Sequence, residues 1–158
     1  MRRKPARGPR PSSIARVDGI DYLDLDQHLG YALRRAQVAA FDAFHRATAG
    51  AGITPPRFTA LVILQANPGI SQSTLGEVLG TARSGAMLLT DWLEARGFAE
   101  RRHRRDDGRA WGLYLTAKGQ RLIERLRRRV RSYDQRFAAR IDQRERRELL
   151  RLLEKLAR

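Results

Sequence analysis

Residues 71–116 read SQSTLGEVLGTARSGAMLLTDWLEARGFAERRHRRDDGRAWGLYLT, and this stretch decides the fold. Residues 71–80 have the pattern of a short amphipathic helix that a glycine ends, and residues 82–96 form a second helix before Gly97. Two strand-like segments around a charged turn follow over residues 98–116. A helix-turn-helix with an attached hairpin holds one helix in a DNA groove. The stretch therefore predicts a winged helix-turn-helix and, with it, a transcription regulator.

Long helical patterns flank this unit on both sides. An apolar stripe at spacings of three and four predicts a helix over residues 25–49, and Thr54-Pro55 opens another. After the hairpin, Thr116 caps a predicted helix over residues 117–139, and a capping box from Asp142 to Glu145 begins a last helix that ends near Leu156. The predicted fold class is mainly α, with six helices and a small β-hairpin wing.

The chain divides into a tail and one folded domain. Residues 1–20 form a basic tail whose first part has few apolar groups, and it is predicted to be disordered. Residues 21–158 form the domain, in which residues 54–116 are the DNA-binding unit and residues 25–53 and 117–158 are dimerisation helices. Long terminal helices bury their apolar stripes against each other, within one chain or across a two-fold axis. A homodimer is favoured because proteins that read DNA grooves commonly use two half-sites.

The charge balance points to a polyanionic partner. The 158 residues include 32 Lys and Arg against 17 Asp and Glu, a net charge of +15 that favours double-stranded DNA. The absence of cysteine excludes a disulfide framework, a cysteine zinc site and a thiol switch. No apolar run approaches the roughly 18–20 residues of a membrane span, so no membrane partner is expected. The expected location is the cytoplasm, in association with the nucleoid.

The predicted recognition helix carries few groups that read bases. Its expected core face consists of Ala82, Ala86, Leu89 and Leu93, and its expected outer face consists of Arg83, Met87, Thr90 and Glu94. Arg83 and Ser84 stand near its start, where Arg83 contacts either guanine or a phosphate. Both alternatives stay open. The preceding helix adds two candidate phosphate donors, Ser73 and Thr74.

The wing concentrates positive charge around its turn. Five arginines lie within nine residues: Arg101, Arg102, Arg104, Arg105 and Arg109. Arg109 is the best candidate to enter a narrow minor groove, and Asp107 orients it or closes the turn. The alternative is a solvated hairpin edge that the charges protect from aggregation. On the returning strand, Trp111, Leu113 and Leu115 alternate and are expected to pack on the helices.

One family shares these motifs. Residues 75–80 (LGEVLG), 91–98 (DWLEARGF), 107–109 (DGR) and 115–119 (LTAKG) give residues 25–158 a pattern that resembles the MarR (multiple antibiotic resistance regulator) family. The resemblance implies a homodimer built from the first and last helices, which binds pseudo-palindromic operators. It also implies a repressor that small, often aromatic or anionic, ligands release. Asp107 and Arg109 resemble the family's wing-tip pair, in which the arginine enters the minor groove.

The chain departs from the family pattern in the recognition helix. Residues 85–88 (GAML) stand where the family often has a polar run, and Trp92 stands where arginine is frequent. Leu88 and Trp92 are one helical turn apart and are candidates to line a ligand pocket between the DNA-binding and dimerisation parts. Ordinary packing is the alternative.

Other classes of function find less support. The chain has no glycine-rich phosphate loop, no cysteine nucleophile and no evident acid–base pair, so no catalytic residue, enzyme activity or cofactor is expected. Asp42 and His45 have a spacing that can hold a metal, yet they lack a second ligand cluster, and no metal site is predicted. Two alternatives remain: a ligand-independent nucleoid-associated or architectural DNA-binding protein, and a protein adaptor that does not touch DNA.

Overall fold

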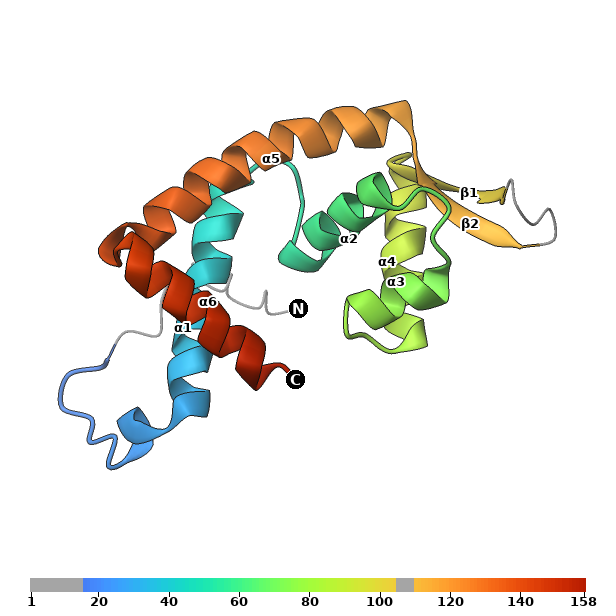
Figure 1. Cartoon of the computed structure of the whole chain (residues 1–158). Helices are drawn as coiled ribbons and strands as arrows, with labels where there is room; N and C mark the ends of the chain where they lie inside the picture. The colour runs from blue at the N-terminus through green and yellow to red at the C-terminus, as the bar shows by residue number, and fades with distance from the viewer. Residues whose placement is uncertain (1–15, 105–109) are drawn as a thin grey trace, which may run out of the picture. The chain divides into compact units, whose positions relative to one another are not determined.

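The computed structural model describes residues 16–104 and 110–158, and the predicted number of helices and strands is confirmed within these ranges (Figure 1). Most of the predicted basic tail lies outside them. In chain order the elements are η1 (Leu25–Gln27), α1 (Leu29–Ala47), α2 (Pro55–Ala66), α3 (Gln72–Val78), α4 (Arg83–Ala95), β1 (Ala99–His103), β2 (Trp111–Leu115), α5 (Ala117–Phe137), η2 (Ala138–Arg140) and α6 (Gln143–Leu156).

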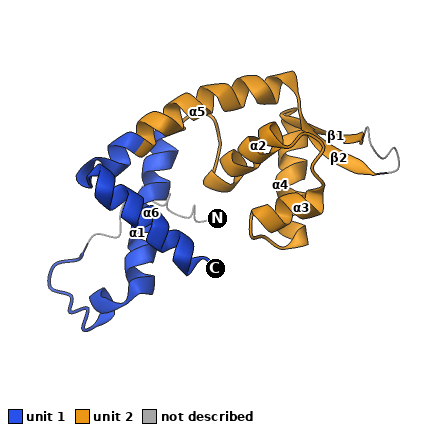
Figure 2. Cartoon of the chain, in the orientation of Figure 1, with its two compact units in different colours: residues 1–47, 135–158 blue, residues 48–134 orange. Residues whose placement is uncertain are grey.

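The chain forms two compact units (Figure 2). One unit combines residues 1–47 with residues 135–158 and contains α1 and α6. The other unit comprises residues 48–134 and contains the helix-turn-helix, the hairpin and most of α5. The first part of α5 thus belongs to the same unit as the hairpin that precedes it.

Capping residues fix several helix starts where the sequence predicts them. The hydroxyl of Ser71 accepts a hydrogen bond from the Thr74 backbone N–H at 3.0 Å and so caps α3. A complete capping box at Asp142 and Glu145 begins α6. Thr54 occupies the N-cap of α2, but its side chain makes no capping hydrogen bond there. A proline at the first turn defines that helix start instead.

The helix-turn-helix depends on a close approach between α3 and α4, which pack against each other. A Cβ on Gly76 would lie 3.1 Å from the Cβ of Ala86, so a larger residue at either position would push the two helices apart. Between the helices, Gly80 has a φ of +59°, a conformation that favours glycine. These small residues set the angle at which α4 leaves the turn.

The hairpin is tied to the segment before α3. Strands β1 and β2 pair antiparallel, with Ala99 opposite Leu115 and His103 opposite Trp111. The backbone of Leu113 exchanges two hydrogen bonds with the segment before α3, accepting from the Gly69 N–H and donating to the Ile70 carbonyl, each at 2.9 Å. The wing is therefore anchored at its base on the side of β2.

The core of the winged unit combines side chains from α2, α3, α4, β2 and α5. Among its fully buried side chains are Leu61, Leu64, Leu75, Leu93, Leu113, Ile123 and Leu126. Burial of one such side chain stabilises a fold by about 1.5–3 kcal/mol, so this unit has a substantial core of its own. It provides a firm base for α4 and the hairpin.

The unit that contains α1 and α6 buries much less. Phe44 is its single buried residue among those described, and no residue of α6 is buried. Large apolar side chains stand exposed along both helices: Leu29, Leu33, Phe41, Leu149, Leu150, Leu152, Leu153 and Leu156. Exposed apolar stripes of this length are unusual on a monomer. Over the described residues, no helix is long and apolar enough to cross a membrane.

Candidate nucleic-acid interface

The start of α4 presents the predicted recognition residues to solvent. Arg83 and Ser84 occupy its first turn and are exposed, and the Met87 side chain one turn later is 47% exposed. A hollow of about 580 Å³ lies beside them, with Ser73, Glu77 and Arg83 among its lining residues. The hollow brings Ser73 of α3 and Arg83 of α4 to one surface, as a contact with one DNA backbone requires.

The two candidate phosphate donors on α3 already have local partners. The Ser71 hydroxyl lies 2.9 Å from the hydroxyls of both Ser73 and Thr74. Both Ser73 and Thr74 are nevertheless exposed, and each hydroxyl retains hydrogen-bonding capacity. The carboxylate of Glu77 lies on the same surface and weakens its attraction for phosphate.

The predicted outer face of α4 is wrong at one position. Thr90 is completely buried, and its hydroxyl donates to the Ala86 carbonyl at 2.7 Å. This hydrogen bond within the helix satisfies the hydroxyl and so lowers the free-energy cost of burying a polar side chain. At the other end of the predicted core face, Ala82 is exposed because it is the N-cap and precedes the first helical turn.

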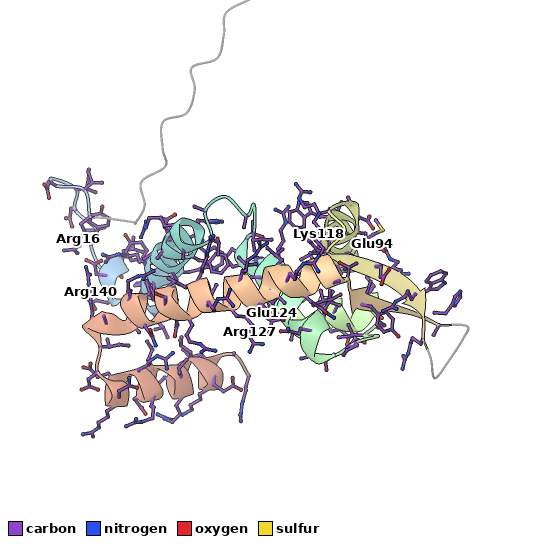
Figure 3. All side chains as sticks on the ribbon, turned by 90° about the horizontal axis from the view of Figure 1, so that it is seen from above. Arg16, Glu94, Lys118, Glu124, Arg127 and Arg140 are labelled. Atoms are coloured by element: carbon purple, nitrogen blue, oxygen red, sulfur yellow. The ribbon has the colours of Figure 1, made fainter. Side chains whose placement is uncertain are left out.

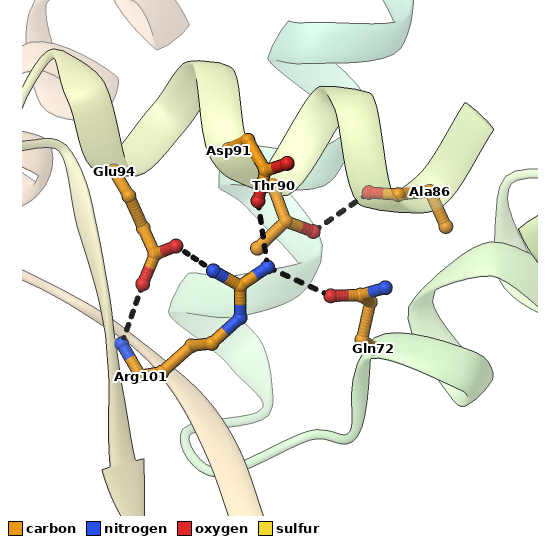
Figure 4. A network of polar contacts seen from close by, with 6 residues as sticks. All are labelled: Gln72, Ala86, Thr90, Asp91, Glu94 and Arg101. Atoms are coloured by element: carbon orange, nitrogen blue, oxygen red, sulfur yellow. Dashed lines mark hydrogen bonds and ion pairs between the residues drawn. The ribbon is translucent and has the colours of Figure 1, made fainter. Parts of the chain in front are cut away.

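Arg101 of β1 is held by three side chains of the helix-turn-helix (Figure 4). Its guanidinium pairs with Glu94, and it also donates to Asp91 and to Gln72, each at 2.9 Å. Its backbone N–H donates to Glu94 at 3.0 Å. These contacts engage both terminal nitrogens of the guanidinium, which the sequence predicts to contact DNA. Arg101 therefore fixes β1 to α3 and α4, a role that its place in a run of arginines does not reveal.

The other arginines predicted in the wing differ in how many contacts they make with the rest of the protein. The exposed Arg102 stacks its guanidinium 4.3 Å from the Tyr114 ring centroid and lies 3.3 Å from a Glu100 carboxylate oxygen. Arg104 is half-buried, and its backbone N–H donates to the Ala110 carbonyl at 2.8 Å. The predicted tip residues Arg105, Asp107 and Arg109 lie outside the described residues.

Trp111 does not pack on the helices as predicted. Its side chain is 57% exposed, whereas Leu113 and Leu115 on the same strand are buried. Trp111 stacks on His103, its partner across the hairpin, with ring centroids 4.2 Å apart. The strands extend past the helices at this point, and cross-strand stacking takes the place of core packing.

Trp92 lies among cations at the C-terminal end of α4. The guanidinium carbons of Arg57 and Arg96 stand 3.8 and 4.0 Å from its ring centroid. Burial and, secondarily, the charge of Arg96 lower the pKa of Arg57 from its ordinary value. Leu88, its predicted companion, is 68% exposed. A ligand pocket lined by Leu88 and Trp92 stays a prediction, because it would lie between the two units.

The Asp42 and His45 pair does not assemble into a larger cluster. One carboxylate oxygen of Asp42 is buried without a hydrogen-bond partner, and the His45 ring packs edge-on against Phe44. Within residues 16–104 and 110–158, no three histidine or acidic side chains lie close enough to hold a metal ion.

Comparison with known sequences identifies a family of regulators. The sequence pattern of the MarR family matches residues 51–110. A protein of Thauera aromatica, named for transcriptional regulation of the hcr operon, is 37% identical over 131 residues, which span 82% of this chain and 79% of the relative. An HTH-type transcriptional repressor of Mycobacterium tuberculosis is 32% identical, over 83% of this chain and 94% of its own length.

Solved structures give the same result. The repressor CouR bound to a 23-mer DNA duplex is 33% identical and superposes with a TM-score of 0.83, over 89% of this chain and all of its own. CouR bound to p-coumaroyl-CoA superposes with a TM-score of 0.80 at the same identity, over 88% of this chain and 98% of its own. PcaV of Streptomyces coelicolor with its natural ligand is 30% identical with a TM-score of 0.77, over 87% of this chain and 97% of its own.

Proposed function

This chain belongs to the MarR family of transcription regulators that bind DNA, and from this premise we propose that it is a ligand-responsive homodimeric repressor with a pseudo-palindromic operator. The observation that carries the proposal is the exposed first turn of α4, held in place by a rigid helix-turn-helix. Arg83 stands there beside Ser73 on one surface. A recognition helix meets base edges with its N-terminal residues.

The proposed DNA contacts come from three elements. Arg83, Ser84 and Met87 of α4 enter the major groove, and Ser73 and Thr74 of α3 bind phosphates. In the wing, the proposed contacts are Arg102, Arg104, Arg105, Asp107 and Arg109, with Arg109 in the minor groove. Arg101 is omitted because its guanidinium is engaged by Glu94, Asp91 and Gln72. The recognition helix adds few other polar groups, so we expect DNA shape to contribute much of the specificity.

Two further features belong to this proposal. The exposed leucines of α6 support a homodimer, because they need a cover that their own unit does not supply. A small aromatic or anionic effector is supported by the p-coumaroyl-CoA complex of the related CouR. A regulator that binds operators acts where the chromosome is, so the proposed location is the cytoplasm, at the nucleoid.

Operator binding by the full chain tests the proposal. Affinity for the chain's own upstream region and for random DNA is measured at two salt concentrations. A specific regulator binds its site about 10³-fold or more tightly than random DNA. Equal affinities for the upstream region and for random DNA, both falling steeply as salt rises, would instead support the architectural alternative. An absence of DNA binding would favour the adaptor. In a reporter strain, loss of the gene should raise expression from the bound promoter.

Substitution of Arg83 then defines its role. If Arg83 reads a guanine, Arg83→Ala relaxes specificity at one operator position by about 1–3 kcal/mol. If it binds a phosphate, Arg83→Ala weakens all DNA uniformly and lowers the salt slope by about one. Arg128→Ala, which removes the same charge from the exposed side of α5, is the matched control.

A further inference from the structure

A second cavity, of about 510 Å³, lies beside the first half of α5 and shares no described lining residue with the hollow at the recognition residues. We call it the basic cavity. Its apolar lining consists of Phe98, Leu122 and Leu126, together with the segment 49–51. Its charged lining consists of Lys118, Arg125 and Arg129. All these residues belong to the unit of residues 48–134. The volume is within the roughly 300–1,000 Å³ range of small-molecule sites.

The charges in this lining are all of one sign. Lys118, Arg125 and Arg129 face the cavity, and none of the described residues that line it carries a carboxylate. In the described part of the chain, no ion pair joins these three cations to an acidic group. Three cations in one cavity without a counter-charge repel each other, and an anion that enters relieves this repulsion.

The apolar lining restricts which anions fit. Leu122 and Leu126 are buried beneath the cavity and offer an apolar floor, and Phe98 adds an aromatic face. An inorganic ion would leave these surfaces uncovered. We propose that the basic cavity binds a small organic anion, with its aromatic or acyl body on Phe98, Leu122 and Leu126 and its carboxylate or phosphate on Lys118, Arg125 and Arg129. This inference rests on the proposed function, for which it names an effector site.

The cavity adjoins the junction between the recognition helix and the wing. Lys118, labelled near the start of α5 in Figure 3, donates its Nζ to the Arg96 carbonyl at the C-terminus of α4, at 2.7 Å. The same ammonium lies 5.1 Å from the centroid of the Phe98 ring. Thr116 donates to the Gly97 carbonyl at 2.6 Å, so the start of α5 holds the whole turn between α4 and β1.

These contacts couple the cavity to DNA binding. An anion in the cavity competes with the Arg96 carbonyl for the Lys118 ammonium. When Lys118 turns to the ligand, the C-terminal end of α4 loses a hydrogen bond that holds it to α5. The ligand therefore lowers the affinity of the regulator for its operator, and Lys118 is the positioning residue that transmits the effect.

Calorimetric titration of the full chain with benzoate, p-coumarate and p-coumaroyl-CoA tests binding. The double variant Arg125→Ala/Arg129→Ala should weaken binding of the effective probe about tenfold or more, because it removes two charge-assisted contacts. The matched control Arg121→Ala/Arg128→Ala removes the same charge from exposed positions of α5 that do not line the cavity, and it should bind as the unaltered chain does. If the cavity recognises a phosphate, only p-coumaroyl-CoA binds. If it recognises a carboxylate, benzoate and p-coumarate bind as well.

Clear outcomes would overturn the inference. If none of the three probes binds, or if the double variant binds them as well as the control does, the basic cavity is not an effector site. Operator affinity without ligand is measured in parallel, so failure of DNA binding is distinguished from failure of the cavity. Lys118→Met removes one ligand contact together with the hydrogen bond to the Arg96 carbonyl. It should therefore weaken ligand binding several-fold and, even without ligand, lower operator affinity toward that of the liganded chain. Unchanged operator affinity of Lys118→Met without ligand would contradict the coupling.

Discussion

Arg101 and Glu94 are joined twice, because the Glu94 carboxylate accepts both the backbone N–H of Arg101, at 3.0 Å, and its guanidinium. One residue belongs to the hairpin and the other to the recognition helix. The pair thus fixes the wing relative to α4, and Gln72 extends the connection to α3. Adjacent arginines in the sequence consequently differ: Arg101 holds the wing in place, and Arg102 is exposed and is a proposed DNA contact.

Substitution of these two neighbours should separate stability from DNA affinity. Arg101→Ala leaves the half-buried Glu94 carboxylate with the backbone N–H but without its charged partner, and should lower the free energy of unfolding by about 2 kcal/mol. Arg102→Ala removes an exposed pair with Glu100 and the contact with the Tyr114 ring, and should cost about 1 kcal/mol. Urea denaturation measures both. In DNA titrations, Arg102→Ala should weaken binding and lower the salt slope by about one. Equal destabilisation by the two variants would contradict the division of roles.

The second prediction concerns Gly85 of α4, where replacing glycine by alanine should not give the usual gain in helix stability. Alanine at an exposed helix position is about 1 kcal/mol better than glycine. A Cβ on Gly85, however, would overlap the Thr81 hydroxyl just before the helix. Gly85→Ala alone should therefore gain nothing. In a Thr81→Ala background the same substitution should raise the free energy of unfolding by about 0.5–1 kcal/mol. A thermodynamic cycle of the four proteins measures this coupling, and simple additivity would show that the overlap is harmless.

The predictable features of this fold are those that local chemistry specifies. The hydroxyl of Ser71 and the capping box at Asp142 begin helices in any context, and the structure confirms both. Thr116 likewise caps α5, where its hydroxyl accepts the Gly119 N–H at 3.1 Å. The hairpin follows from apolar alternation around a turn signal. None of these features requires knowledge of what lies across the core.

The wrong predictions, and the features that the sequence does not reveal, concern contacts between residues that are brought together only by the fold. The helical pattern places the polar Thr90 on the outer face, but a hydrogen bond to the carbonyl one turn before it permits burial. Trp111 follows the alternation of Leu113 and Leu115, yet its position depends on how far the hairpin extends past the helices. Arg101 looks like its neighbours and differs only because Glu94, Asp91 and Gln72 converge on it in space. The basic cavity could be found only once α5 and Phe98 were placed together.

The apolar stripe of α6 predicts the state of association. Leu152→Glu places a charge among the exposed leucines of that helix and should shift the chain from dimer to monomer. In a two-fold dimer each substitution counts twice, so the dissociation constant should rise about a hundredfold or more. Arg147→Gln, which alters the net charge by the same amount on the polar side of α6, should leave the dimer intact. Sedimentation velocity over a concentration series measures the monomer–dimer equilibrium of both variants. A Leu152→Glu chain that remains dimeric would show that the dimer interface does not include this face of α6.

Gly119, the one glycine of α5, is expected to tolerate no larger residue. A Cβ at this position would overlap the Phe98 carbonyl oxygen and lie 2.9 Å from its carbonyl carbon, and both atoms belong to the backbone. No side-chain rotation relieves the contact, so α5 must move away from the start of the hairpin. Gly119→Ala should therefore lower the free energy of unfolding by about 2–3 kcal/mol, opposite in sign to the usual effect of alanine in a helix.

The matched control for this substitution is Gly30→Ala in α1, where nothing lies within 4 Å of an added Cβ. It should follow the ordinary rule and stabilise the chain by about 0.5–1 kcal/mol. Urea denaturation at one fixed protein concentration compares the two, because association also contributes to apparent stability. The Gly119 substitution should also affect DNA binding. Because the Phe98 carbonyl also accepts the Thr116 N–H at 3.1 Å, a shift of α5 should displace the base of the wing as well. Gly119→Ala should accordingly weaken operator binding even under conditions where the variant remains folded. A variant as stable and as active as the parent would show that α5 can leave Phe98 without consequence for DNA binding.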